Sequence, residues 1–122
     1  MVQRTPWVGE RVLVTGAGGF IGSHLVEALA RRGARVRALV RYNGRGDWGH
    51  LESLDPALAR RLEVRAGDVR DPRRMAQAVA GCGTVFHLAA LIAIPYSYRA
   101  PQSYVDTNVT GILRACQSFF EP

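Results

Sequence analysis

The feature of this sequence that most limits its fold is a run of glycines between an apolar segment and a helical pattern. Residues 11–15 (Arg-Val-Leu-Val-Thr) form a short apolar run that is typical of a buried strand. Residues 16–22 (Gly-Ala-Gly-Gly-Phe-Ile-Gly) follow directly. Apolar residues then recur at helical spacing until Gly33, a residue type that commonly ends helices. The sequence therefore predicts a tight turn that leads from a strand straight into a helix.

The spacing of Gly16, Gly19 and Gly22 bears on whether this turn binds a ligand. A glycine-rich turn between a strand and a helix is the setting in which a dinucleotide binds. Gly16 permits the tight turn, Gly19 lets the backbone approach a pyrophosphate, and Gly22 lets the helix pack closely. The helix N-terminus then offers free N–H groups to the anion. Because the first two glycines are one residue further apart than in the simplest fingerprint, a structural turn without a ligand is the alternative; the setting favours a dinucleotide.

The rest of the chain continues the alternation of strands and helices. Strands are expected at residues 11–15, 35–40, 62–66 and 84–88, and helices at residues 20–32, 72–80 and 101–119, with a short helix within residues 51–61. Residues 42–50 are expected to form a loop. In the last helix, Tyr104, Asn108, Ile112 and Ala115 are expected to lie along one face. The pattern predicts an α/β fold, a Rossmann-type doubly wound parallel sheet of about four strands in the order 3-2-1-4.

Composition excludes several other classes of protein. The net charge is +6, and all 16 basic residues are arginines, which are scattered along the predicted helices. This distribution is typical of solvated faces and argues against nucleic-acid binding. No apolar run reaches the length of a membrane span, and no secretory signal begins the chain. Cys82 and Cys116 lack metal-ligand spacing, so we expect no metal site and reduced thiols in a cytoplasmic protein.

The second predicted strand bears on the choice of cofactor. It ends at Val40-Arg41, where an NAD-binding chain would carry an acid for the ribose 2′-OH. An arginine there pairs with a 2′-phosphate instead, so Arg41, together with Arg45, favours NADP. The alternatives are NAD, or Arg41 as a plain surface residue.

Two further strand ends supply candidate contacts. Asp68-Val69 follows the third strand, where the carboxylate would accept from the adenine amino group or form a local Asx turn. Leu88, Ala89 and Ala90 lie at the end of the fourth strand, and small residues there let a cofactor lie across the carboxyl ends of the strands. His24 and His87 have no carboxylate partner in the sequence, and we expect structural roles for both.

Four motifs together carry a resemblance to a known family. They are Thr15-Gly-Ala-Gly-Gly-Phe-Ile-Gly22, Gly67-Asp-Val69, His87-Leu-Ala-Ala90 and Thr107-Asn-Val-Thr-Gly111. The chain resembles the extended short-chain dehydrogenases/reductases, also described as NAD-dependent epimerases/dehydratases. Residues 41–43, 47–49 and 89–98 look more narrowly like nucleotide-sugar 4,6-dehydratases that act on nucleotide-linked N-acetylglucosamine.

The resemblance implies a reaction and a set of contacts. Hydride would leave C4 of the sugar, water would be eliminated across C5 and C6, and hydride would return to C6. The implied contacts are Gly16, Gly19, Phe20, Ile21 and Gly22 at the pyrophosphate, Arg41 at the adenosine ribose, Asp68 and Val69 at adenine, Leu88, Ala89 and Ala90 along the cofactor, Asn108 as support from the last helix, and residues 94–98 near the nucleotide sugar.

The chain departs from the family at its catalytic residues. The family uses a Tyr-x-x-x-Lys pair, and this sequence contains no lysine. We therefore assign no catalytic residue and interpret residues 1–122 as the N-terminal, NAD(P)-binding portion of a longer enzyme, inactive alone. A nucleotide-sugar 4-epimerase or reductase, or a non-catalytic NAD(P)-binding module, remains an alternative. Family resemblance also suggests a homodimer.

Overall fold

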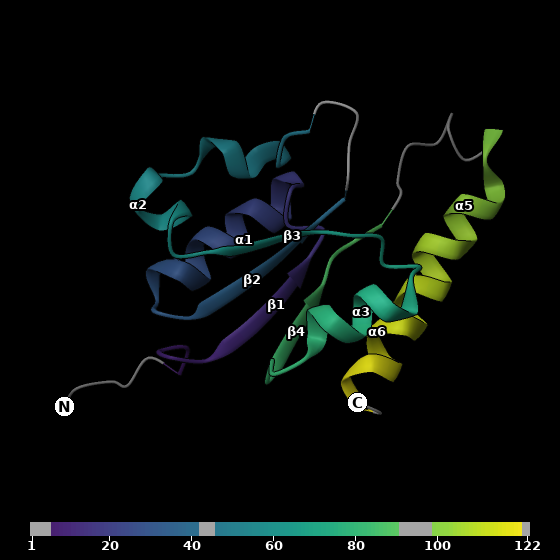
Figure 1. Cartoon of the computed structure of the whole chain (residues 1–122). Coiled ribbons are helices and arrows are strands. Elements are labelled where there is room, and N and C mark those ends of the chain that lie inside the picture. Colours follow the sequence, from purple (N-terminus) through teal and green to yellow (C-terminus); the bar gives the residue numbers. More distant parts are fainter. Residues whose placement is uncertain (1–5, 42–45, 91–98, 121–122) are drawn as a thin grey trace.

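Four parallel strands form one sheet in the order β3-β2-β1-β4, as the sequence predicts (Figure 1). The strands are β1 (Arg11–Thr15), β2 (Arg35–Val40), β3 (Glu63–Ala66) and β4 (Thr84–His87). This computed structural model describes residues 6–41, 46–90 and 99–120. Thr15 pairs with Leu39 on one side and with His87 on the other, so the carboxyl ends of the three strands lie level. The Rossmann-type topology predicted above is confirmed.

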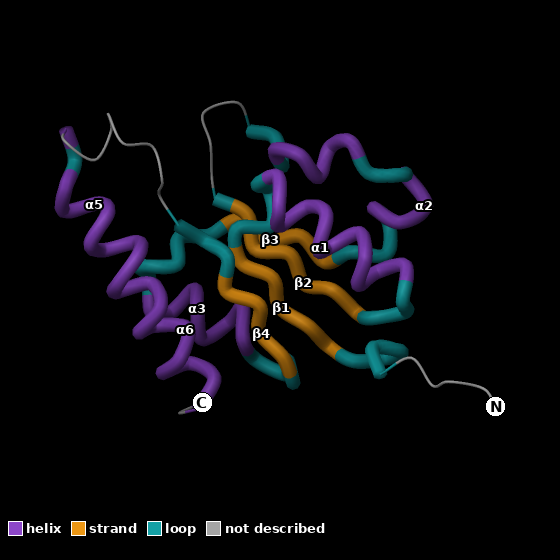
Figure 2. The backbone as a smooth tube through the Cα atoms, turned by 180° about the vertical axis from the view of Figure 1, so that it is seen from behind, coloured by secondary structure: helices purple, strands orange, loops and turns teal. Residues whose placement is uncertain are grey.

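Helices cover both faces of the sheet. Helix α1 (Phe20–Arg31) and the short α2 (Pro56–Ala59) lie on one face, and α3 (Pro72–Val79) and α6 (Gly111–Phe120) lie on the other (Figure 2). Within the described residues, no helix is both long enough and apolar enough to cross a membrane.

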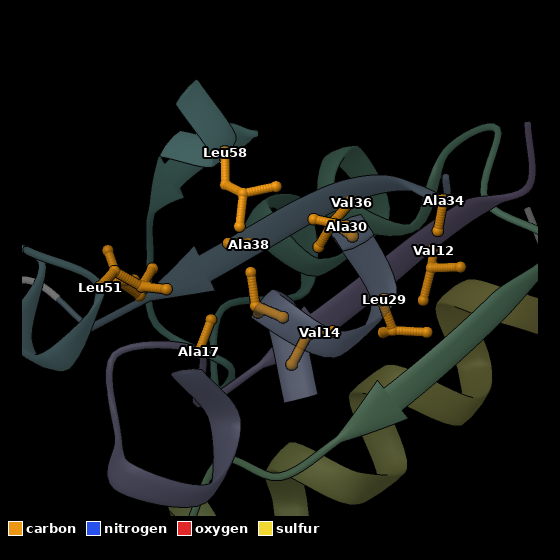
Figure 3. Packing of buried hydrophobic residues seen from close by; sticks show 12 residues of the cluster. Val12, Val14, Ala17, Leu29, Ala30, Ala34, Val36, Ala38, Leu51 and Leu58 are labelled. Carbon is orange, nitrogen blue, oxygen red and sulfur yellow. The ribbon is translucent and has the colours of Figure 1, made fainter. Parts of the chain in front are cut away.

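Alternation along the strands divides the buried side chains into two cores. Val12 and Val14 of β1 point toward α1 and pack with Leu29, as Figure 3 shows. Leu13 points to the opposite face, where it packs with Met75 of α3. Because both faces of β1 are buried, its run of apolar residues is continuous, as in other parallel sheets.

The short helix expected within residues 51–61 is α2, and a 3₁₀ turn precedes it. The structure has a 3₁₀ helix at Gly49–Ser53, which begins inside the predicted loop, followed by the short α2. Asp55 separates them because its backbone is not helical (φ −51°, ψ 126°) and its side chain caps α2, with Oδ1 accepting from the N–H of Ala57 at 2.9 Å. Pro56 lacks an N–H group and so starts a helix more readily than it continues one.

The predicted last helix is also interrupted. Helix α5 (Pro101–Val105) passes into α6 through a π-helical turn at Asp106–Thr110. A π turn accommodates an extra residue, which rotates every later side chain around the helix axis. Ala115 is buried, but Ile112, predicted to lie on the same face, is 51% exposed.

Candidate dinucleotide-binding site

A pocket of about 540 Å³ lies at the carboxyl ends of the strands. It is lined by Gly16, Gly19, Phe20, Ile21, Gly22, Leu39, Arg41, Gly67, Asp68, Val69, Arg70, Leu88, Ala89, Ala90 and Thr107. Among the described residues, the structure thus brings together the predicted contact residues except Asn108. Ligands of doubly wound sheets bind at this end, outside the carboxyl ends of the strands.

The glycines of the loop make close backbone contacts. Gly16 has a φ of +65°, and a β-carbon there would lie 2.9 Å from backbone atoms of Leu88 and Ala89. A β-carbon on Gly22 would lie only 2.1 Å from the carbonyl oxygen of Gly16. Gly19 has an ordinary φ of −76°, and its nearest such contact is 3.3 Å. The backbone of the turn therefore requires glycine at positions 16 and 22. It does not require glycine at position 19.

The N-terminus of α1 opens onto this pocket without a side-chain cap. Gly19 occupies the N-cap position and has no side chain that could accept from the first-turn N–H groups. Phe20 and Ile21 are 67% and 72% exposed at the pocket wall. Uncapped N–H groups and the positive end of the helix dipole together form an anion-binding surface.

Thr15 organises the opposite wall, a role that the sequence reasoning missed. Its hydroxyl oxygen accepts from the N–H groups of Leu88 at 3.0 Å and Ala89 at 3.1 Å. It lies 2.8 Å from Nδ1 of His87, and the whole side chain is buried. Because both lone pairs of the oxygen are used, the hydroxyl proton goes to His87 Nδ1. Thr15 therefore fixes the segment that leaves β4 along the pocket.

Both histidines discussed above make local structural contacts. Since Nδ1 of His87 accepts, the ring is neutral with its proton on Nε2, and burial lowers the pKa of this imidazole. His24 bonds to the carbonyl oxygen of Phe20 through Nδ1 at 2.7 Å, and the two rings lie 4.5 Å apart. These contacts agree with the structural roles predicted for them.

The charged side chains gather on one side of the pocket. Arg70 donates to both carboxylate oxygens of Asp68 and thereby holds the pKa of Asp68 below its usual value. Asp68 also accepts from the backbone N–H of Arg70 at 2.9 Å, which is the Asx turn that the sequence left open. Arg41 is exposed at the end of β2 and lines the same pocket.

A second hollow of about 950 Å³ continues the site past Arg41. Its outer wall is the segment that includes Trp48, Gly49 and His50. His50 donates its backbone N–H to the carbonyl oxygen of Gly18 at 2.9 Å, and a β-carbon on Gly49 would lie 2.5 Å from that oxygen. The segment is therefore fastened directly to the glycine-rich loop.

The last helix contributes differently from expectation. Thr107 lines the pocket, whereas Asn108, in the π turn, is not part of its wall. Gly111 brings α6 close to the pocket, since a β-carbon there would lie 2.9 Å from Cγ2 of Val69. The predicted contacts of Arg45 and of residues 94–98 lie outside the described residues. No cluster of metal-ligating side chains occurs in the part of the chain that the structure describes.

A family model decides the identity of this fold and pocket. Residues 13–118 match the model described as GDP-mannose 4,6 dehydratase. The chain belongs to this family of nucleotide-sugar epimerases and dehydratases. The family is NAD(P)-dependent, and the chain forms its Rossmann part.

Individual relatives of this epimerase/dehydratase chain differ in their reactions. It is 38% identical over 108 residues to UDP-glucuronate 4-epimerase 1 of Arabidopsis thaliana, covering 86% of this chain and 25% of that protein. It is 43% identical over 103 residues to cinnamoyl-CoA reductase 1 of Petunia hybrida, covering 84% of this chain and 29% of that protein. Other relatives include UDP-glucuronate and UDP-glucose 4-epimerases.

A solved structure of WbmH from Bordetella bronchiseptica, in complex with NAD+, superposes with a TM-score of 0.72 at 27% identity. The match covers 90% of this chain and 35% of that one. The chain thus spans about a quarter to a third of the length of the relatives it matches.

Thr15, Leu39, Gly67, Arg70 and Thr107 were not predicted as site residues. Leu39 and Gly67 follow from the topology alone, because each lies at or just beyond the carboxyl end of a neighbouring strand. Arg70 and Asp68 are two residues apart in the sequence, and this spacing alone does not indicate which side chains pair. Thr15 had a usable signal, since a polar residue directly before the glycine turn of a buried strand needs a partner.

Proposed function

We propose that this chain binds NADP, with its pyrophosphate at the N-terminus of α1. The observation that carries the proposal is the uncapped helix start, which opens onto the pocket behind Gly16 and Gly19. A side chain at Gly19 would stand between the ligand and the N–H groups, although the fold itself would tolerate one. The remaining lining is mostly apolar and suits the flat ring faces of a dinucleotide.

Arg41 supports NADP over NAD. Its side chain lies between the main pocket and the hollow beside Trp48, and it lines both. The adenosine ribose of a dinucleotide bound at α1 would reach this position, where a guanidinium pairs with a 2′-phosphate. Asp47 and Glu52, the acids in that hollow, accept backbone N–H groups of Gly49 and Trp48 at 3.0 Å.

The test is a titration of the chain with NADPH and NADH, followed by cofactor fluorescence. Replacing a charge-assisted contact of about 1.5–3 kcal/mol predicts that Arg41→Ala weakens NADPH binding by about ten- to a hundredfold. NADH binding should change little. The control is Arg31→Ala, because Arg31 pairs with Glu27 on the outside of α1. Equal loss of both cofactors in Arg41→Ala, or no binding of either by the wild type, would refute the assignment.

We also propose that the chain is the N-terminal part of a nucleotide-sugar 4,6-dehydratase. The family model that it matches and residues 41–43 and 47–49 support this reaction. The 4-epimerases among its relatives support a second candidate, nucleotide-sugar 4-epimerisation. A Tyr-x-x-x-Lys pair encoded directly downstream of the Pro122 codon would support both reactions. The product that the encoded enzyme forms from a nucleotide sugar would then distinguish a dehydratase from an epimerase. A coding sequence without that pair would leave a non-catalytic NAD(P)-binding module.

The chain's own residues would bind and orient in this reaction. A bound nicotinamide cofactor supplies reversible hydride transfer. The N-terminus of α1 would hold its pyrophosphate. Leu88, Ala89 and Ala90 would support it from the β4 side, held in place by the Thr15 hydroxyl. Adenine would lie near Asp68 and Val69, with the Asp68 carboxylate already engaged by Arg70.

We further propose that two copies associate through α5 and α6. The support is an exposed apolar stripe along these helices, formed by Val105, Val109, Ile112 and Leu113. Val109 alone is 63% exposed. Val109→Asp should shift the molar mass measured by light scattering from dimer to monomer, whereas Ala76→Asp on the exposed side of α3 should not. A monomeric wild-type chain would refute this arrangement.

A further inference from the structure

A basic hollow lies at the end of the sheet opposite the dinucleotide pocket. It has a volume of about 500 Å³ and is lined by Arg11, Arg35, Arg37, Arg61, Glu63 and Cys82, with Val36. Arg11 and Arg35 are the first residues of β1 and β2, and Arg61 comes just before β3. The hollow is therefore at the amino ends of the strands, where the strand arrows begin in Figure 1.

The strand register forces like charges together. Arg11 is the direct partner of Arg35 across β1 and β2, so their side chains leave the sheet on the same face. Like charges directly opposite each other on neighbouring strands are destabilising. In the described part of the chain, neither guanidinium has a hydrogen bond or an ion pair with a protein group. Each therefore presents five unused N–H donors.

The other groups in the hollow do not relieve this charge. Glu63 accepts from Nε of Arg37 at 2.9 Å and also pairs with Arg65 outside the hollow, and these contacts hold its pKa below the usual value. Arg37 also donates to two carbonyl oxygens at the end of α3, those of Ala78 and Ala80, both at 2.7 Å.

Arg61 donates to the carbonyl oxygen of Ala30 at 3.1 Å, and this bond holds its guanidinium at the rim of the hollow. Burial raises the pKa of the Cys82 thiol, so this group adds no negative charge. The single carboxylate among the lining residues is thus already engaged, while Arg11 and Arg35 remain unneutralised.

We propose that the basic hollow is a second ligand site, which binds a small phosphate-bearing anion between Arg11 and Arg35. Guanidinium groups recognise phosphate oxygens through paired N–H bonds, and two adjacent groups match the charge of a phosphate dianion. The volume is that of a small-molecule site. A bound anion would also remove the repulsion between the two strands. The inference does not depend on dinucleotide binding at the other end of the sheet.

The probe is inorganic pyrophosphate, titrated into the whole chain at constant ionic strength and followed by NMR of the arginine side-chain N–H signals. The signals of Arg11 and Arg35, assigned from their single variants, should shift and saturate. Arg35→Gln should weaken this binding by about tenfold, the value of one lost charge-assisted contact. Arg31→Gln, on the outside of α1, should leave it within about twofold.

Three results would overturn the inference. One is no shift of the Arg11 and Arg35 signals at any pyrophosphate concentration. Another is a response confined to the backbone N–H signals of residues 19–22, which would locate the anion only at α1. The third is an equal effect of Arg31→Gln and Arg35→Gln, which would indicate general charge screening. NADPH titrations of Arg35→Gln should match the wild type, so a failure of dinucleotide binding would be seen separately.

Discussion

Replacing Gly22 by alanine tests the close contact between α1 and the glycine-rich loop. Gly22 is the third residue of α1, a position at which alanine would ordinarily gain about 1 kcal/mol in helix propensity. Its β-carbon would, however, lie 2.1 Å from the carbonyl oxygen of Gly16, far inside the 3.0 Å that real β-carbons essentially never cross. The atom it meets belongs to the backbone, so no side-chain rotation can relieve the overlap.

The size of the effect follows from these two opposing terms. Overpacking of this kind costs up to about 3 kcal/mol, and we take the upper value because the backbone has to move. Subtracting about 1 kcal/mol of helix propensity leaves a net loss of about 2 kcal/mol. In a chain of 122 residues each kcal/mol lowers Tm by about 4 °C, so Gly22→Ala should melt about 8 °C below the wild type.

Thermal unfolding followed by circular dichroism measures this loss, and Gly19→Ala is the matched control. Gly19 has a φ of −76° and its nearest contact would be 3.3 Å, so its Tm should fall by no more than about 4 °C. Gly19→Ala should nevertheless lose NADPH binding, because its methyl group would stand over the helix N-terminus. A Tm for Gly22→Ala within about 2 °C of the wild type would refute the packing argument.

Three other changes test separate parts of the structure. Thr15→Val leaves the buried N–H groups of Leu88 and Ala89 without an acceptor and should cost about 2–4 kcal/mol in urea unfolding, whereas Thr15→Ser should retain most of that stability. Because burial lowers the pKa of His87 below 6.5, its imidazole binds a proton more readily in the unfolded chain than in the folded one. Stability should therefore fall as pH decreases below about 6.5, and a His87→Gln variant showing the same slope would count against this source. Arg37→Met should lower the free energy of unfolding measured in urea by about 2–3 kcal/mol through loss of its bonds to the end of α3; an unchanged free energy would show that water replaces them.

The sheet and the glycine-rich turn could be predicted because both are encoded locally. The strands are apolar runs that end at glycine or polar residues, and their order follows from the handedness of the crossovers. The turn roles expected of Gly16 and Gly22 agree with the structure, because Gly16 has a φ of +65° and Gly22 contacts the backbone of Gly16, six residues earlier. The boundaries of α1 and α3 differ from expectation by only one residue.

What the sequence did not reveal depends on contacts between distant residues or on subtle backbone geometry. The Thr15 hydroxyl joins groups more than 70 residues away, and no spacing rule indicates that pairing. The π turn before Gly111 has no simple sequence signal, so Ile112 was wrongly predicted to share a face with Ala115. The side-chain pairing of Asp68 with Arg70 was also not predicted, although the local Asx turn at Asp68 was one of the two alternatives.

The two ends of β2 allow a last prediction about independence. Arg35 begins the strand in the basic hollow, and Arg41 follows its last residue at the dinucleotide pocket. A strand rises about 3.3 Å per residue, so the two positions lie about 20 Å apart, beyond the distance at which substitutions usually couple. The effects of Arg35→Gln and Arg41→Ala on pyrophosphate and NADPH binding should therefore add within about 0.5 kcal/mol in the double variant. A larger coupling would mean that the strand transmits the state of one site to the other, and the two anion sites would then have to be treated as a single linked system.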